Sequence, residues 1–273
     1  MIMKFFLRLF FIALIAVAFN VHASDLAKEK RWADQVVDAI LDGDAVWLND
    51  GKSDFLGIYT EAEAITDTSK GRAVIVMHGT GIHPDWQQVI QPLRVGLTEH
   101  NWNTLSIQMP ILANEAEYVD YAPLYDEVAA RVDAAIKYLK DNGSEDIVLL
   151  GHSQGSAMTA YYLSSSYLSG AKRAGAKQKI KGFVAIGLAA FAKDERMNSI
   201  LSLEKITIPV LDLYGDEDLE NILATVDVRA AAAKKAGNKN YTQIKITGNH
   251  FFDGQDEMLL KTVADWLEKT TGR

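Results

Sequence analysis

The sequence predicts an α/β fold, with a mostly parallel central sheet and helices on both of its faces. First, short apolar runs alternate with amphipathic stretches of helical spacing along most of the chain. Second, these runs are continuously apolar, which is typical of parallel strands buried on both faces. Third, the chain has 273 residues, of which 48% are hydrophobic, and neither a linker nor an internal repeat divides it. One large core is therefore expected.

The order of the elements follows from these runs. An N-terminal helix is expected from Leu26 to Asp42, with Gly43 ending it. Residues 45–61 predict an antiparallel hairpin, because Asp50-Gly51 is a strong turn signal. Further strands are expected at 73–77, 104–108, 147–150, 182–186, 210–214 and 243–246. Helices are expected near 86–99, 122–140, 155–167, 221–236 and 256–269.

The helix near 86–99 carries a recognisable start signal. Asp85 precedes it and Gln88 stands three residues later. This spacing is that of a capping box, in which the first side chain accepts a hydrogen bond from the opening turn. The helix is therefore expected to begin at Trp86, with Asp85 as its N-cap.

The N-terminus, MIMKFFLRLFFIALIAVAFNVHASD, predicts export. Lys4 and Arg8 form a positive start, and the apolar run that follows is too short to span a bilayer comfortably. Val21-His22-Ala23 places small residues at the positions that a signal peptidase reads. We therefore expect a signal peptide over 1–23, cleaved after Ala23, and a single periplasmic domain over 24–273 without an integral membrane span. An uncleaved N-terminal anchor is the alternative.

Charge and cysteine content exclude several function classes. The net charge of −8 disfavours a nucleic-acid partner, because an acidic surface repels phosphate backbones. The absence of cysteine excludes disulfides, a thiol nucleophile and cysteine-ligated metal. The histidines are scattered, without metal-ligand spacing, so neither a metal nor a cofactor is expected.

Ser153 lies in the stretch LLGHSQGSAM, where an apolar strand meets a helix. Such a tight reversal forces the residue at its apex into a strained backbone conformation. Gly151 and Gly155 flank it, because a side chain at either position would clash where strand and helix approach each other. The pattern G-x-S-x-G in this strand–turn–helix context is that of a nucleophile elbow, which makes Ser153 the candidate nucleophile.

A serine nucleophile needs a base, and the base needs an orienting acid. His250 is the only histidine after Ser153 and directly follows the last predicted strand, so it is the candidate base. Asp212 falls inside the strand at 210–214 and is expected to be structural. The loop after that strand holds three acidic candidates, Asp216, Glu217 and Asp218.

From about residue 71 to its end, the sequence resembles the α/β-hydrolase superfamily. PVLDLYGDED, at 209–218, matches the superfamily pattern P-V-L-x-x-x-G-x-x-D, whose last Asp is catalytic. The resemblance therefore implies Asp218 as the acid, with Asp216 as its main rival. Many members insert a large lid where this chain has only residues 187–209, so an α/β-hydrolase fold with little or no lid is expected.

An acyl-transfer transition state carries a negative oxygen, which backbone amides must stabilise. One amide is expected from Gln154, the residue after the nucleophile. The segment His78-Gly79-Thr80-Gly81 resembles the superfamily's HGxG oxyanion segment and implies the amide of Thr80 as the second donor.

Two further stretches are similar to those of a group of exported bacterial α/β hydrolases of unassigned activity. They are GIHPDWQQVIQPLR and WNTLSIQMP. This resemblance implies the fold and the serine machinery but no substrate. His83 and Trp86 are candidates for the mouth of the site, although loop packing would explain them equally well.

Together these features predict an exported serine hydrolase that cleaves an ester or related acyl bond of a small-molecule substrate. Two alternatives stay open at this point. One is a non-catalytic envelope binding or interaction protein that keeps a hydrolase scaffold. The other is a peptidase, thioesterase or acyltransferase with the same three residues, because fold and triad do not set the leaving group or the acceptor.

Overall fold

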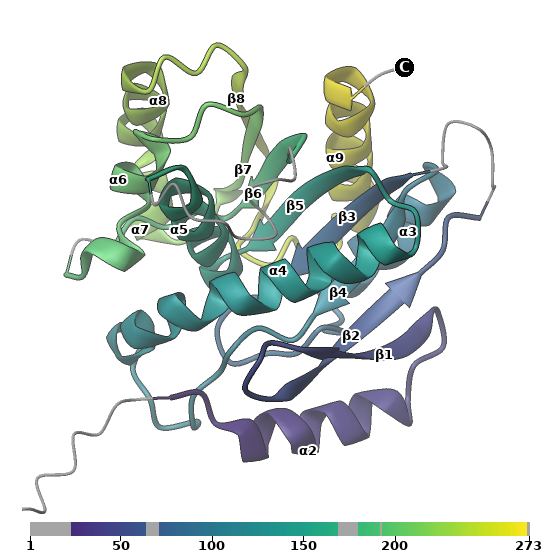
Figure 1. Cartoon of the computed structure of the whole chain (residues 1–273). Helices are drawn as coiled ribbons and strands as arrows, with labels where there is room; N and C mark the ends of the chain where they lie inside the picture. The colour runs from purple at the N-terminus through teal and green to yellow at the C-terminus, as the bar shows by residue number, and fades with distance from the viewer. Residues whose placement is uncertain (1–22, 64–70, 169–179, 192, 272–273) are drawn as a thin grey trace, which may run out of the picture.

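The computed structural model describes residues 23–63, 71–168, 180–191 and 193–271 and shows a central sheet between two layers of helices (Figure 1). Its strands are β1 Asp44–Asn49, β2 Asp54–Thr60, β3 Arg72–Met77, β4 Asn103–Ile107, β5 Asp146–His152, β6 Gly182–Ile186, β7 Val210–Glu217 and β8 Tyr241–Asn249. Its helices are α2 Leu26–Val37, α3 Ile90–Glu99, α4 Tyr125–Asp141, α5 Gln154–Leu168, α6 Ser199–Leu203, α7 Glu220–Leu223, α8 Val226–Lys235 and α9 Asp256–Thr271, with 3-10 helices η1 Tyr118–Leu124 and η3 Glu195–Met197.

The strands of the described residues form one mixed sheet in the order β1-β2-β4-β3-β5-β6-β7-β8. β1 and β2 form an antiparallel hairpin that turns through residues 50–53, and β2 is also antiparallel to β4. The neighbours from β4 to β8 are parallel. The predicted α/β class, the mostly parallel sheet and the N-terminal hairpin are confirmed.

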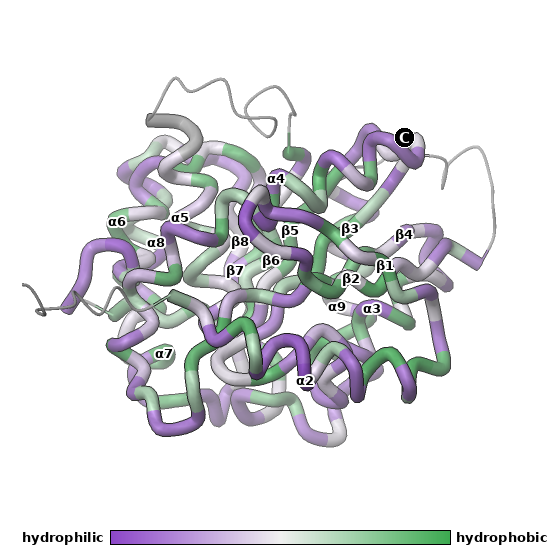
Figure 2. Tube along the Cα trace, turned by 60° about the horizontal axis from the view of Figure 1, so that its bottom comes forward, coloured by the Kyte–Doolittle hydropathy of each residue, from purple (hydrophilic) through white to green (hydrophobic). Residues whose placement is uncertain are grey.

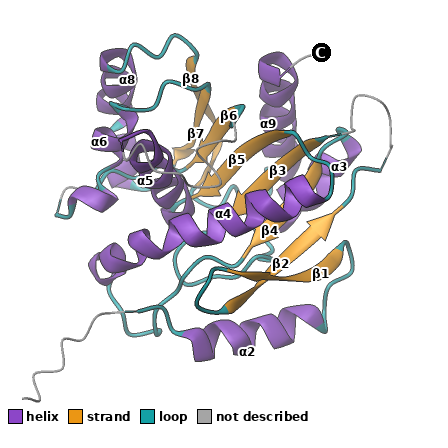
Figure 3. Ribbon diagram, viewed as in Figure 1, coloured by secondary structure: helices purple, strands orange, loops and turns teal. Residues whose placement is uncertain are grey.

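Helices on both faces explain the continuously apolar strands. In β3, Val74 and Val76 face a core with α3 and α9, whereas Ile75 and Met77 face a core with α4 and α5. Figure 2 shows hydrophobic residues along the central strands and many hydrophilic residues around them. Figure 3 shows helices on both faces of the sheet, and burial on both sides explains why the central strands are mostly apolar. Buried polar side chains such as Thr104, Ser106 and Asp212 are the exceptions.

The connection between β6 and β7 is short, as expected for a fold with little or no lid. In its described part it holds only η3 and α6, and both pack against α5. The carboxyl ends of the parallel strands lie at one edge of the sheet, where ligands bind in folds of this kind. Within the described ranges, no helix has the length and apolar character needed to cross a membrane.

The N-terminal helix is shorter than predicted, because it ends at Val37 and not at Asp42. Gly43 serves the hairpin instead of the helix. It has a φ of 84°, and a Cβ there would lie 2.6 Å from the carbonyl oxygen of Tyr59. Only glycine tolerates both the positive φ and this close approach.

The helix predicted at 86–99 begins late, at Ile90, after Val89 with a φ of 62°. The predicted cap at Asp85 is wrong. Its carboxylate instead accepts a hydrogen bond from Nε of Arg94, at 2.7 Å, and this guanidinium is fully buried. Leaving a buried guanidinium without a carboxylate costs more free energy than leaving an exposed helix turn without a cap. The stretch predicted as one helix at 221–236 forms two, α7 and α8.

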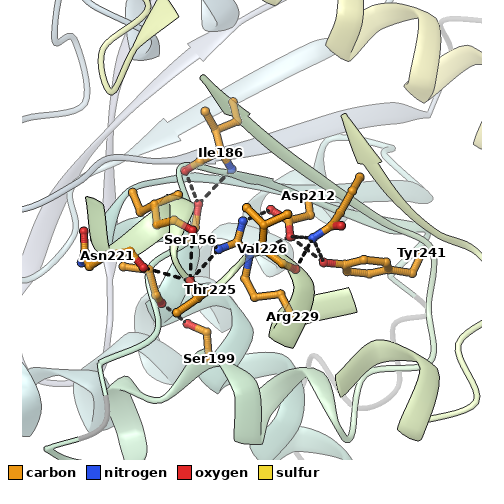
Figure 4. A network of polar contacts seen from close by, with 12 residues as sticks. Ser156, Ile186, Ser199, Asp212, Asn221, Thr225, Val226, Arg229 and Tyr241 are labelled. Carbon is orange, nitrogen blue, oxygen red and sulfur yellow. Dashed lines mark hydrogen bonds and ion pairs between the residues drawn. The ribbon is translucent and has the colours of Figure 1, made fainter. Parts of the chain in front are cut away.

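Asp212 is structural, as the sequence predicted. Its side chain is fully buried and accepts hydrogen bonds from Nε of Arg229, at 2.7 Å, from Nε2 of Gln243, at 3.0 Å, and from the hydroxyl of Tyr241 (Figure 4). Arg229, on α8, is also fully buried. These hydrogen bonds of Asp212 therefore join β7 to β8 and to α8.

We expect Asp212→Ala to lower the free energy of unfolding by about 3–5 kcal/mol, because it leaves the buried charge of Arg229 without a carboxylate partner. Urea unfolding, followed by circular dichroism, measures the loss. The matched control is Asp34→Ala, which breaks the exposed pair of Asp34 with Lys30 and should leave stability nearly unchanged. Equal stability of the two variants would contradict the role assigned to Asp212.

Candidate active site

Ser153 occupies the reversal between β5 and α5, with a φ of 55°. A Cβ at Gly151 would lie 2.6 Å from the backbone of Gly155 and Ser156. A Cβ at Gly155 would collide with the carbonyl oxygens that end β3. These close approaches explain the glycines on either side of the serine. The strained backbone raises the Ser153 hydroxyl above the edge of the sheet.

Three candidate residues from separate loops meet at this edge. Nε2 of His250, which follows β8, lies 2.9 Å from Oγ of Ser153. Nδ1 of the same ring lies 2.7 Å from Oδ1 of Asp218, which follows β7. The structure thus brings the three sequence-predicted residues into one hydrogen-bonded chain. An imidazole held in this way is positioned to take the hydroxyl proton of the serine.

The rival acid Asp216 lies elsewhere. Its side chain is exposed, and Oδ1 accepts a hydrogen bond from the amide of Gly248 at 2.9 Å. The side chain of Asp218 is fully buried against the ring of His250. The geometry therefore favours Asp218, in agreement with the register that the resemblance implied.

The electrostatics keep Asp218 charged. Burial alone raises the pKa of its carboxyl group. The hydrogen bond and the charge of His250, with the amides of Leu219 and Gly215, outweigh burial and hold the pKa below its ordinary value. A buried carboxylate that stays ionised stabilises an imidazolium beside it.

Gly187 has a role that the sequence pattern does not predict. It follows β6 with a φ of 59°, and a Cβ there would lie 2.8 Å from Cε1 of His250. Any side chain would thus displace the imidazole from Ser153 and Asp218. A glycine at the end of an apolar strand is a weak signal by itself, because only the folded structure shows which ring lies against it.

His152 is a second residue of the site whose role the sequence pattern does not predict. Its ring lies 4.9 Å from that of His250, centroid to centroid, and its Nε2 hydrogen-bonds the carbonyl oxygen of His250 at 3.0 Å. Burial, with repulsion from His250, lowers the pKa of His152 to about 4. It therefore stays neutral at physiological pH and braces the backbone of the His250 loop.

The two expected oxyanion donors flank the nucleophile. Gln154 opens α5 directly after Ser153, and Thr80 lies in the loop after β3. Within the described part of the chain, neither backbone amide donates to a protein acceptor. Gly79 lets this loop approach, since a Cβ there would lie 3.1 Å from Cβ of Ser153. Both amides are therefore without a protein acceptor among the described residues, and the loops that carry them meet at Ser153.

His78 holds the loop in place. Its Nδ1 lies 2.9 Å from the carbonyl oxygen of Gly79, and its Nε2 accepts the amide of Met109 at 2.9 Å. Burial lowers the pKa of His78 to about 3, so the ring is neutral and donates from Nδ1. Because the carbonyl and the N–H of a trans peptide point in opposite directions, this bond directs the amide of Thr80 away from His78.

His83 and Trp86 lie in a cleft beside α2, and the lining of that cleft includes neither Ser153, Asp218 nor His250. The cleft is joined to the site indirectly. Nε2 of Gln88 donates to Asp253 at 2.6 Å, in the loop that carries His250. Contact of His83 or Trp86 with the substrate of Ser153 stays a prediction.

Solved structures show the same fold. Est1E from Butyrivibrio proteoclasticus is 16% identical, with 84% of this chain and 99% of that chain aligned and a TM-score of 0.59. The esterase Pf2001 from Pyrococcus furiosus is 18% identical, with 84% and 92% aligned and a TM-score of 0.63. XC6422 from Xanthomonas campestris, described as an α/β serine hydrolase without lid, is 14% identical, with 84% and 95% aligned and a TM-score of 0.60.

At the level of sequence, no curated protein matches this chain. A family model does match, over residues 21–122 and 122–269, and its description is "Protein of unknown function (DUF3530)". The two matched segments span nearly all of the described residues. The chain therefore belongs to the DUF3530 family, and it has the α/β-hydrolase fold.

Proposed function

We propose that this protein is an exported serine hydrolase that cleaves an ester or related acyl bond of a small molecule. The observation that carries the proposal is the hydrogen-bonded chain from Ser153 through His250 to Asp218. Its place at the carboxyl edge of the sheet, with two unpaired amides beside the serine, supports the same chemistry. The esterases among the structures of the same fold are consistent with it.

The proposed reaction has two stages. His250 takes the proton of Ser153 through Nε2 while Oγ attacks the acyl carbon, and the amides of Thr80 and Gln154 hold the negative oxygen. Collapse of this intermediate breaks the acyl–oxygen bond, and His250 returns the proton to the leaving alcohol. Water then attacks the acyl-enzyme by the same route, which releases the acid and restores Ser153.

A panel of activated substrates tests this proposal. The short connection between β6 and β7 leaves little chain to cover the site, which favours small soluble esters over bulky triglycerides. We expect hydrolysis of short-chain nitrophenyl esters, with lower rates on matched thioesters and amides. Rates no higher than background on all three substrate classes would contradict the proposal and favour a binding protein on the same scaffold.

The pH profile gives a second test. We expect kcat/KM to fall as the pH drops below neutrality, because a histidine base accepts a proton only while its ring is neutral. Asp218 does not cause this fall, since its pKa lies below its ordinary value and its carboxylate stays charged. Its contribution to stability is present above its unfolded pKa and is lost only as the pH falls through the lower, folded pKa. A profile that is flat between about pH 5 and 8 would contradict a histidine base.

Export with cleavage after Ala23 is part of the proposal. Residues 1–22 of the expected signal peptide, 1–23, lie outside the described residues. A contact of Ser24 supports the proposal. Its hydroxyl donates to Oε2 of Glu127 at 2.9 Å, and its backbone nitrogen lies 3.4 Å from Oε1. Cleavage after Ala23 would turn this amide into a terminal ammonium that faces the carboxylate of Glu127. The N-terminus would then form an ion pair with α4.

In the chain that begins at Ser24, we expect Glu127→Gln to lower the melting temperature by about 2–4 °C near pH 7. Glutamine removes the negative charge that would face the terminal ammonium but leaves a side chain of nearly the same shape. Calorimetry at pH 7 measures the shift. Glu99→Gln, at an exposed site on α3, is the control. Equal shifts in the two variants at neutral pH would contradict the pairing.

A further inference from the structure

A cleft of about 570 Å³ lies between α2 and residues 83–91, outside the chain of Ser153, His250 and Asp218. It is open to solvent, and its walls come from parts of the chain far apart in sequence. Open clefts with aromatic walls and a few polar groups are where small ligands bind. The chemistry of the walls indicates which ligand this cleft fits.

Aromatic rings form one part of the wall. The ring of His83 lies between two indoles, 5.5 Å from Trp32 and 5.3 Å from Trp86, and both contacts are edge-to-face. All three side chains are partly exposed. In edge-to-face contacts, part of each ring stays uncovered and can contact another apolar surface.

Neutral hydrogen-bonding groups form the rest of the cleft wall. The side-chain amides of Gln35, Gln87 and Gln91 line the cleft and make no side-chain hydrogen bond within the described part of the chain. Each offers an acceptor and two donors. His83 accepts the amide of Asp85 at Nδ1, at 3.2 Å, so its Nε2 carries a hydrogen and is a further donor.

The cleft carries no free charge. Its carboxylate, Asp85, is bound by the buried guanidinium of Arg94. Burial lowers the pKa of His83, against the charge of Asp85, so the imidazole stays neutral at physiological pH. Lys28 lies over the ring of Trp32, with Nζ 4.9 Å from its centroid, but it does not line the cleft and donates to the carbonyl oxygen of Leu112. The described lining therefore offers no unpaired charge to a ligand. A ligand with an apolar face and several hydroxyl groups would satisfy both kinds of wall.

We propose that this cleft is a binding site for a neutral carbohydrate, in which the C–H face of a sugar ring lies against Trp86 and Trp32 and its hydroxyls bind the glutamine amides. The proposal rests on the cleft itself and is independent of the chemistry at Ser153. The site does lie next to the His250 loop. Trp86 donates to Oε1 of Gln88 at 3.1 Å, and Gln88 donates to Asp253 in that loop. A sugar bound here would be linked to the His250 loop through Gln88.

Titration of the full protein with cellotetraose, maltotetraose and tetra-N-acetylchitotetraose tests the proposal. Tryptophan fluorescence and calorimetry report binding. We expect at least one of these sugars to bind with a millimolar or lower Kd, and Trp86→Ala to weaken it by about tenfold or more. Trp47→Ala is the matched control, because Trp47 is 55% exposed and lies outside this cleft. It should change the Kd less than twofold.

Two more variants keep the test decisive. Gln35→Ala changes an exposed amide on α2 and is not expected to disturb folding, so it replaces Trp86→Ala if that variant does not fold. Ser153→Ala should bind the sugar like the unchanged protein, which separates this site from the proposed hydrolysis. Absence of binding for all three sugars at about 10 mM would overturn the proposal. So would binding that Trp86→Ala and Gln35→Ala leave intact, or preference for a planar aromatic acid over every sugar.

Discussion

Ser153→Ala is expected to lower kcat on an activated ester by about 10⁶-fold, the loss seen when a serine protease loses its nucleophile. The hydroxyl of Ser153 is the atom that would form the covalent bond, and no other group lies at hydrogen-bond distance from Nε2 of His250 among the described residues. Alanine keeps the same backbone at a φ of 55°, so the melting temperature should change little. Steady-state kinetics and thermal unfolding of one preparation measure both quantities.

The matched control is Ser165→Ala, further along the same helix. The hydroxyl of Ser165 bonds back to the carbonyl oxygen of Tyr161 and has no place in the site. This variant should keep full activity. Comparable turnover in Ser153→Ala would mean that hydrolysis uses another nucleophile, and the assignment would be wrong.

Asp218→Asn is expected to lower kcat by at least about 10²-fold, because the same replacement in a serine protease costs about 10⁴. Asparagine removes the charge that stabilises the imidazolium. Its amide also favours the ring tautomer in which Nδ1 is the acceptor, so that Nε2 carries a proton and cannot take one from Ser153. The 2.7 Å contact with Nδ1 and the full burial of Asp218 allow no water to replace the lost carboxylate.

Asp216→Asn provides the comparison for this prediction. Asp216 is exposed and bonds the amide of Gly248, so asparagine should preserve that contact and cost less than about tenfold. Kinetics of both variants on one ester decide between the two carboxylates. A larger loss of kcat in Asp216→Asn would identify Asp216, and not Asp218, as the acid.

The sequence predicted those parts of the site that depend on local pattern. Ser153 was predicted because the glycine spacing and the strand-to-helix reversal are both visible in ten consecutive residues. His250 and Asp218 were predicted from their order along the chain and from their places after strands, because parallel strands end at one edge. The strands were predicted because burial on both faces leaves continuous apolar runs.

Features that depend on contacts between distant segments were not predicted. Gly187 is needed only because the His250 ring lies against it, 63 positions later in the chain. The start of α3 was misplaced because Asp85 binds Arg94, nine residues later, and only the folded structure shows that this guanidinium is buried. The cleft between Trp32 and Trp86 depends likewise on how α2 packs.

The most direct test of the central claim is the intact mass of the protein after incubation with a fluorophosphonate, followed by peptide mapping of the adduct. Only a serine activated by a base reacts quickly with this probe. We predict a single adduct per chain, located on Ser153 and absent from the Ser153→Ala variant. An unmodified protein, or an adduct on any other residue, would contradict the assignment of Ser153, His250 and Asp218 as the catalytic residues.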